Sequence, residues 1–227
     1  MKKHTEPLFA EQFYHIYNRG INGTDVFIEE KNYAFFLNKY IQYIEPIAET
    51  YAYSLLKNHF HIMVRMRSVE EIIGAVQPKV KVKGGAGANV GEVLNLADVE
   101  LDPEILASKL ISRRFGTFFN SYSQAINKVH GRTGSLFEEP FRRIPINSEN
   151  YGCWLIYYIH ANPQKHRFVD DFREYPHSSW HSFLSKANTR IKRNEALDWF
   201  GGLKGFLHFH NDKNPLDESS IFGIELD

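Results

Sequence analysis

Cysteine is almost absent from this chain, since Cys153 is the only one among 227 residues. A single cysteine excludes an intramolecular disulfide and argues against a structural zinc site built from thiolates. Net charge is also absent, because 27 Lys and Arg balance 27 Asp and Glu. Composition therefore gives no argument for a nucleic-acid partner, and any basic surface has to be local.

Long apolar runs are missing as well. No stretch approaches the roughly 20 apolar residues of a membrane span. The first residues, from Met1 to Pro7, lack the apolar core of a secretory signal. These two absences predict a cytoplasmic protein with no membrane partner.

What the chain does have is enough apolar sequence for a large core, at 43% hydrophobic and 15% aromatic residues. The length fits one large domain, or one domain with an appendage. Residues 78–103, rich in Gly and Lys at their start, read as a flexible insertion, and residues 186–227 as a C-terminal extension. Whether that extension packs on its own domain or on a partner stays open.

Hydrophobic patterning predicts the secondary structure. The expected strands are 13–18, 51–56, 59–66 and 141–146, the last at a sheet edge because Pro140 precedes it and Pro145 lies within it. The expected helices are 31–44, 68–76, 104–130 and 149–162, and Pro163 should end the last one. Hairpin turns between some strands favour an α+β fold with an antiparallel sheet over a doubly wound parallel sheet.

Two histidines and a tyrosine helix carry the chemistry. His59 and His61 alternate on one strand and so share a face. Tyr158 and Asn162 are four residues apart on a helix and also share a face, whereas the adjacent Tyr157 points elsewhere. If the two faces meet, a pocket holds two imidazoles, an amide oxygen and a phenol, which suits metal-assisted attack of a tyrosine on a phosphodiester.

Simpler interpretations stand beside this one. The histidine pair could merely pack, Tyr158 could be a half-buried core residue, and Asn162 could cap its helix. His160 should face away from Tyr158. A second His-x-His, formed by His208 and His210, is a weaker metal candidate because no suitable helix partner is evident.

Several blocks together resemble the HUH single-tyrosine transposases, and most closely the REP-associated tyrosine transposase branch. His59-Phe60-His61 matches the motif that gives HUH its letters, and Tyr157 to Pro163 resembles the tyrosine helix. The blocks from Tyr14 to Gly20, Gly131 to Phe137 and Tyr175 to Trp180 follow in the same order as in the family. The resemblance covers about residues 11–185, which makes 1–185 the expected catalytic domain.

The resemblance implies a ferredoxin-like antiparallel sheet with flanking helices. It also implies a single-stranded DNA endonuclease and strand transferase that acts through a 5′-phosphotyrosine link in transposition or REP-element processing. The family's nucleophile falls on Tyr158, and its ligands for Mg²⁺ or Mn²⁺ fall on His59, His61 and Asn162. The implied substrate is single-stranded DNA, often with hairpin ends. Family members are often homodimers, but the REP-associated branch can act as monomers.

Local basic residues offer contacts for DNA phosphates. Between 113 and 143, six Lys or Arg face two Glu, a local excess of +4. The predicted DNA-binding residues are Arg19, Arg113, Arg114, Arg132, Arg142, Arg143, Lys165 and Arg167. Arg142 and Arg143 are adjacent in a strand, so at most one contacts DNA from a given face. Tyr122, Phe137 and Phe141 could stack on bases, although Phe118, Phe119 and Tyr122 fit the core better.

Two rival functions remain at this stage. One is a related HUH nuclease, either a replication initiator or a relaxase, but these often carry a third histidine or a second tyrosine one helical turn away. The other is a domesticated nucleic-acid-binding protein that kept the fold and lost activity. Binding that persists in chelator, without a covalent adduct, would favour the second rival.

Overall fold

The structure is a computed structural model that describes residues 6–76 and 101–212. Its strands are β1 (Phe13–Arg19), β2 (Ala48–Leu56), β3 (His59–Met66) and β4 (Arg142–Ile146). Its helices are α1 (Glu30–Tyr43), α2 (Val69–Val76), α3 (Pro103–Val129), α4 (Glu149–Lys165), α5 (Trp180–Leu184), α6 (Arg193–Trp199) and α7 (Leu203–Asn211), with short 3₁₀ turns at Ile21–Gly23 and Phe172–Glu174.

The strands form one antiparallel sheet in the order β2-β3-β1-β4. The chain reaches it in the sequence β1, α1, β2, β3, α3, β4, which is the ferredoxin-like arrangement. Lys57 and Asn58 make the tight turn of the β2–β3 hairpin, and β4 lies at the sheet edge, as its prolines predict. The predicted α+β fold class is therefore confirmed.

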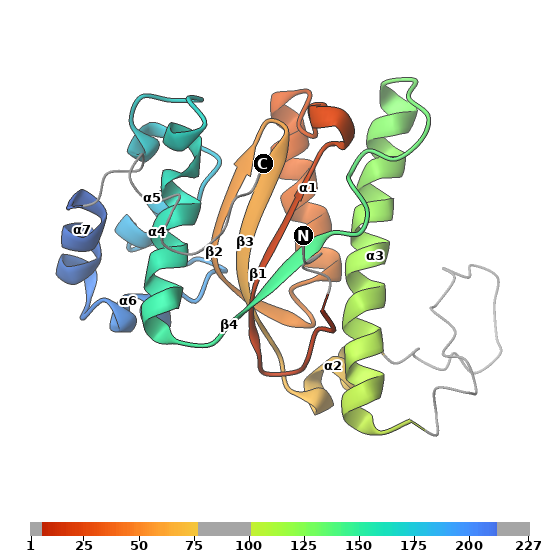
Figure 1. The fold of residues 1–227 in the computed structure, drawn as a ribbon, viewed down its shortest axis with the longest axis horizontal. Coiled ribbons are helices and arrows are strands. Elements are labelled where there is room, and N and C mark those ends of the chain that lie inside the picture. Colours follow the sequence, from red (N-terminus) through yellow and green to blue (C-terminus); the bar gives the residue numbers. More distant parts are fainter. Residues whose placement is uncertain (1–5, 77–100, 213–227) are drawn as a thin grey trace.

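Helices cover both faces of the sheet, because its strands are apolar on both sides (Figure 1). One core lies between the sheet and α1, α2 and α3, and it includes Ile16, Phe60 and Phe118. The other lies between the sheet and α4 to α7, and it includes Met63 and Tyr157. Alternation along β1 and β3 thus sends Tyr14, Ile16 and Asn18 to the first face, and His15, Tyr17 and Arg19 to the second.

The described part of the C-terminal extension packs on its own chain. The indole of Trp199 in α6 stacks on Tyr51 of β2, with ring centroids 5.2 Å apart. In α7, Phe206 is fully buried. The predicted insertion at 78–103 lies largely outside the described residues. Within the described ranges, none of the helices has the length and apolar character needed to cross a bilayer.

Candidate functional site

The sheet places both histidines of the HUH-like motif on the face that α4 covers. In the β1–β3 register, Tyr17 lies opposite His61 and Arg19 opposite His59. Because directly opposed residues share a face, all four side chains point toward α4. His61 is 1% exposed, and His59 is partly exposed near the end of the strand. The pair therefore spans the boundary between the core and the surface.

The sequence predicted that helix α4 ends before Pro163, but the structure shows that it continues. It begins at the cap Ser148, whose side chain accepts from the backbone N–H of Tyr151, and it runs through Pro163 to Lys165. Proline removes a single backbone donor, and the backbone N–H of His166 closes the last turn by donating to the carbonyl of Asn162 at 3.0 Å. Asn162 is thus a fully buried helix residue, which excludes the alternative that its side chain caps the C-terminus.

The strand face and the helix face meet. His59 Nε2 lies 3.0 Å from Asn162 Oδ1. The ring of Tyr158 packs edge-on against His61, with centroids 5.5 Å apart, and the two histidine rings are 5.2 Å apart. Side chains from two segments about a hundred residues apart in the sequence therefore form one cluster.

His59 has one proton for two oxygen atoms. Burial lowers its pKa to about 4, so the ring is neutral at neutral pH. Its Nδ1 lies 2.7 Å from Asn58 Oδ1, which can only accept, so Nδ1 must carry the proton. The lone pair of Nε2 then faces Asn162 Oδ1, a second acceptor, at 3.0 Å. With the Asn162 amide in this orientation, a cation lying against both atoms would satisfy both electron pairs.

His61 lies beside His59, with ring centroids 5.2 Å apart. Burial holds its pKa well below the usual range, and the neighbouring His15 and His59 lower it further. Its Nδ1 lies 3.0 Å from His15 Nε2. Its Nε2 is buried and has no hydrogen-bond partner among the described residues. A neutral imidazole with an unused, buried nitrogen is the form in which histidine binds metal ions.

These atoms fit a divalent cation. Two ligands at right angles on an ion of the Mg²⁺ type, each at about 2.1 Å, are separated by about 3.0 Å, which matches the distance between His59 Nε2 and Asn162 Oδ1. No group of three or more His, Cys, Asp or Glu suited to a metal ion occurs in residues 6–76 and 101–212. A cation site here therefore depends on the amide of Asn162 beside the two imidazoles.

Tyr158 sits at the edge of this cluster, half-buried. The ammonium of Lys165, two turns further along α4, lies 5.3 Å from the centre of its ring. A cation over an aromatic face is attracted to it and favours any negative charge that develops on the phenol. Tyr157, by contrast, is 1% exposed and packs against Phe209 and His210 on the other side of the helix.

Only some of the predicted DNA-binding residues lie near this cluster. Arg19 is opposite His59 in the sheet, Lys165 lies over Tyr158, and Arg142 is paired with Tyr17 in the register. Arg19 and Arg142 both lie 3.6 Å from Glu138, which partly neutralises them. Arg167 is exposed just after α4, with a left-handed φ of 59°.

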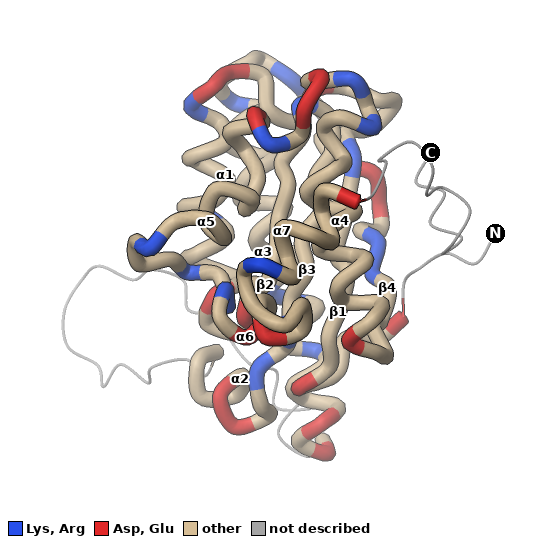
Figure 2. The backbone as a smooth tube through the Cα atoms, turned by 90° about the vertical axis from the view of Figure 1, so that its left-hand side faces the viewer, with Lys and Arg blue, Asp and Glu red and all other residues tan. Residues whose placement is uncertain are grey.

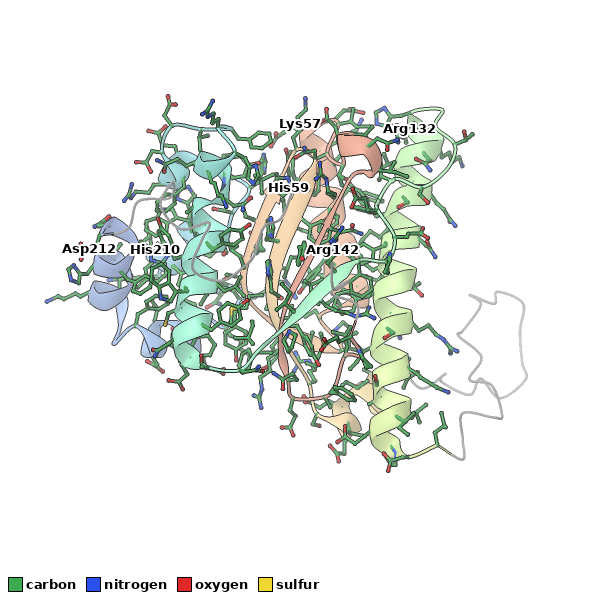
Figure 3. The ribbon with its side chains drawn as sticks, viewed as in Figure 1. Lys57, His59, Arg132, Arg142, His210 and Asp212 are labelled. Atoms are coloured by element: carbon green, nitrogen blue, oxygen red, sulfur yellow. The ribbon has the colours of Figure 1, made fainter. Side chains whose placement is uncertain are left out.

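The remaining arginines lie elsewhere. Arg113 and Arg114 belong to α3, which covers the opposite face of the sheet, and Arg143 points to that face, with its guanidinium 4.8 Å from the ring of Phe141. Arg132 follows α3 and lies at the same end of the molecule as His59 and Lys57 (Figure 3). Acidic and basic positions are mixed along the backbone at that end of the molecule (Figure 2).

Tyr122 lies in the core, as the sequence analysis preferred, and the structure corrects the suggestion that Phe137 stacks on bases. They are 0% and 4% exposed and belong to the core between the sheet and α3. Phe118 and Phe119 are buried beside them, as the sequence analysis preferred. Phe141 is partly exposed but already packs against Phe115.

The second His-x-His, which the sequence analysis rated below His59 and His61, does not form a pair. It lies on α7, where residues two apart point in nearly opposite directions. His208 is exposed and lies 3.2 Å from Asp212 (Figure 3), whereas His210 is fully buried, 3.1 Å from His160. His160 faces away from Tyr158, as expected, but its partner on α7 was missed.

Sequence reasoning also missed His15 and Asn58. Both contact the Nδ1 atoms of the histidine pair, and His15 is fully buried. Asn58 immediately precedes the motif, so its proximity could have been noticed. In the register of β1 and β3, Tyr17 lies opposite His61, and His15 lies two residues before Tyr17 on the same face. Only this register could have identified His15.

Comparison with known proteins bears on the fold. No protein-family model matches the chain, and no curated protein matches it either. A solved structure described as the REP-associated tyrosine transposase bound to a REP hairpin superposes with a TM-score of 0.53 and 13% sequence identity, covering 82% of this chain and 86% of that chain. The chain thus has the fold of a REP-associated tyrosine transposase over most of its length.

Proposed function

We propose that this protein cuts and rejoins single-stranded DNA with Tyr158 as the nucleophile, in DNA transposition or in the processing of REP-like elements. His59, His61 and Asn162 would hold the divalent cation, Mg²⁺ or Mn²⁺. The observation that carries the proposal is the approach of His59 Nε2 and Asn162 Oδ1 to 3.0 Å beside the ring of His61. Tyr158 lies against that same ring.

The chemistry follows from these positions. The oxygen of Tyr158 bonds to the phosphorus of a DNA phosphodiester, and the bond from phosphorus to the 3′ oxygen breaks. The phenol gives up a proton and the departing 3′ oxygen takes one up, so the products are a 5′-phosphotyrosine and a free 3′-OH. A bound divalent ion would polarise the scissile phosphate. Attack by another 3′-OH reverses the step and joins the strands without ATP.

The chain's own residues assist by position. Lys165 stabilises negative charge on the phenol across the ring face, at 5.3 Å. Arg19 and Lys165 flank the cluster and can contact phosphates on either side of the cut. The hairpin bound by the structurally similar transposase, at 13% identity, supports DNA that is single-stranded next to a hairpin as the substrate.

The test is a denaturing gel with labelled single-stranded DNA from the flanks of the coding region, in Mn²⁺. The wild type should form a protein–DNA adduct that survives denaturant, and Tyr158→Phe should form none. Tyr157→Phe is the matched control, because Tyr157 packs against Phe209 and His210 on the other side of α4 from His59 and His61, and it should form the adduct like the wild type.

Two results would contradict the proposal. An adduct that Tyr158→Phe still forms would assign the nucleophile to another residue. No adduct with the wild type, together with a gel shift insensitive to chelator, would indicate a nucleic-acid-binding protein that retains the fold without the activity.

A further inference from the structure

We propose that His15 is a positioning residue that fixes the tautomer and the orientation of the His61 ring. In this arrangement His61 Nδ1–H donates to His15 Nε2, which leaves the electron pair of His61 Nε2 directed into the cluster. The role of that electron pair in binding a cation rests on the proposed function, whereas the hydrogen bond between the two rings is present in the metal-free chain.

The geometry around His61 leaves little freedom. His15 Nε2 lies 3.0 Å from His61 Nδ1, and the two side chains are 0% and 1% exposed. Their rings are stacked with centroids 5.1 Å apart. The ring of Tyr17 is also stacked with that of His61, at 5.8 Å. His61 is therefore held by two neighbours on β1, and water has no access to compete for its Nδ1.

The proposed cation site assigns the direction of the bond. A neutral imidazole carries one N–H, so either His61 donates to His15 or His15 donates to His61. Burial does not choose between the two, because the second nitrogen of each ring is buried. If His15 donated, the proton of His61 would sit on Nε2 and occupy the electron pair that a cation needs, so the proposed function requires His61 to donate.

Asn58 does the same for the other histidine. Its Oδ1 accepts from His59 Nδ1–H at 2.7 Å and so directs His59 Nε2 into the cluster. The two imidazoles are therefore oriented by different acceptors, an amide near the surface and an imidazole in the interior. A carboxylate is a more common partner of a ligand histidine. In the place of His15, which is 0% exposed, a carboxylate would lose its hydration. A neutral ring avoids that cost.

Nuclear magnetic resonance of the metal-free protein tests the hydrogen bond directly. A long-range ¹H–¹⁵N correlation distinguishes Nδ1–H from Nε2–H rings, and His61→Gln assigns the signals of His61. We expect Nδ1–H for His61 in the wild type and in His15→Gln, whose amide oxygen can still accept. In His15→Leu the Nε2–H form should become populated. An Nε2–H ring in the wild type, or no change in His15→Leu, would overturn the proposal.

Affinity for Mn²⁺ alone, followed by electron paramagnetic resonance, gives the second readout. Loss of such a partner typically weakens metal binding about 10–100-fold, so we expect that loss in His15→Leu and rescue in His15→Gln. His181→Leu, at an exposed position of α5, is the matched control and should bind as the wild type does.

The two proposals fail in different ways. Equal Mn²⁺ affinity in wild type and His15→Leu would refute the positioning role while leaving the cation site intact. No Mn²⁺ binding by the wild type, together with an Nδ1–H tautomer that depends on His15, would refute the cation site and keep the hydrogen bond. Circular dichroism of each variant establishes that it is folded.

Discussion

At the scale of single residues, the site is defined by a mismatch between protons and acceptors. His59 donates its only N–H to Asn58, and its other nitrogen lies 3.0 Å from the side-chain oxygen of Asn162. Other buried polar atoms are paired directly; for example, the hydroxyl of Tyr122 donates to the carbonyl of Val26 at 2.9 Å. A cluster of buried nitrogen and oxygen atoms that a cation would satisfy is the kind of arrangement expected of a binding site.

A divalent cation should therefore stabilise the folded chain. At 100 times its dissociation constant, Mn²⁺ should raise the free energy of unfolding by about 2.7 kcal/mol. We expect this rise in the wild type and its loss in His59→Ala, measured by thermal unfolding with and without EDTA. His181→Ala is the control, and a rise of equal size in His59→Ala would place the ion elsewhere.

At the scale of elements, α4 decides whether the site exists. It carries both Tyr158 and Asn162, and its position against the sheet is set near its start by Gly152. A Cβ at Gly152 would lie 3.0 Å from the indole of Trp199 and 3.4 Å from Met63. The absence of a side chain there lets α4 approach β3 closely enough for Asn162 to reach His59.

Two glycine substitutions test this packing. Gly152→Ala should lower the free energy of unfolding by about 1–3 kcal/mol, because the indole or the helix must move. In Gly116→Ala, in α3, the added atom has nothing within 4 Å. This substitution should raise the free energy of unfolding by about 0.5–1 kcal/mol, because alanine lowers the conformational entropy of the unfolded chain. Urea denaturation measures both changes. A gain in Gly152→Ala would show that Trp199 does not limit the approach of α4.

At the scale of the whole molecule, a buried polar chain ties α7 to the sheet. Ser179 Oγ accepts from the N–H of Tyr53 in β2 at 2.9 Å and lies 2.8 Å from His160 Nε2. His160 Nδ1 lies 3.1 Å from His210 Nε2, and His210 Nδ1–H donates to the carbonyl of Phe206 at 2.8 Å. Each neutral ring has one proton, and all four ring nitrogens lie within hydrogen-bonding distance of a partner.

This row of buried, hydrogen-bonded side chains makes the stability of the fold sensitive to acid. Burial lowers the pKa of His210 to about 3 and that of His160 well below its usual value. Below pH 6.5 the histidines of the unfolded chain bind protons, whereas the buried rings of the folded chain stay neutral. Their contribution to the free energy of unfolding is therefore fully present above pH 6.5 and is lost as the pH falls. The loss should be about 1 kcal/mol per histidine over the first pH unit.

Urea denaturation at pH 7, 6 and 5 checks the direction and the size. His210→Gln removes one titrating group and should give a shallower pH profile than the wild type. His208→Ala, on the exposed side of the same helix, should leave the profile unchanged. A stability that is flat from pH 7 to pH 5 in the wild type would show that these rings are not held neutral.

The sequence by itself determined the local elements and the pairs that lie within them. Alternation on 59–66 put His59 and His61 on one face, helical spacing put Tyr158 beside Asn162, and the order of strands and helices indicated an antiparallel α+β sheet. These features depend on short-range geometry, which neighbouring residues fix. The failure at Pro163 was also local, because a proline in the last turn removes only one hydrogen bond and α4 continues to Lys165.

Only the tertiary structure decided which faces meet. The register of β1 on β3 brought His15 to His61, the docking of α4 brought Asn162 to His59, and the packing of α7 turned His210 into the partner of His160. Each of these contacts joins residues between 46 and 103 positions apart. Such contacts depend on how the apolar faces of whole elements are buried together, and no spacing within a single segment encodes that arrangement.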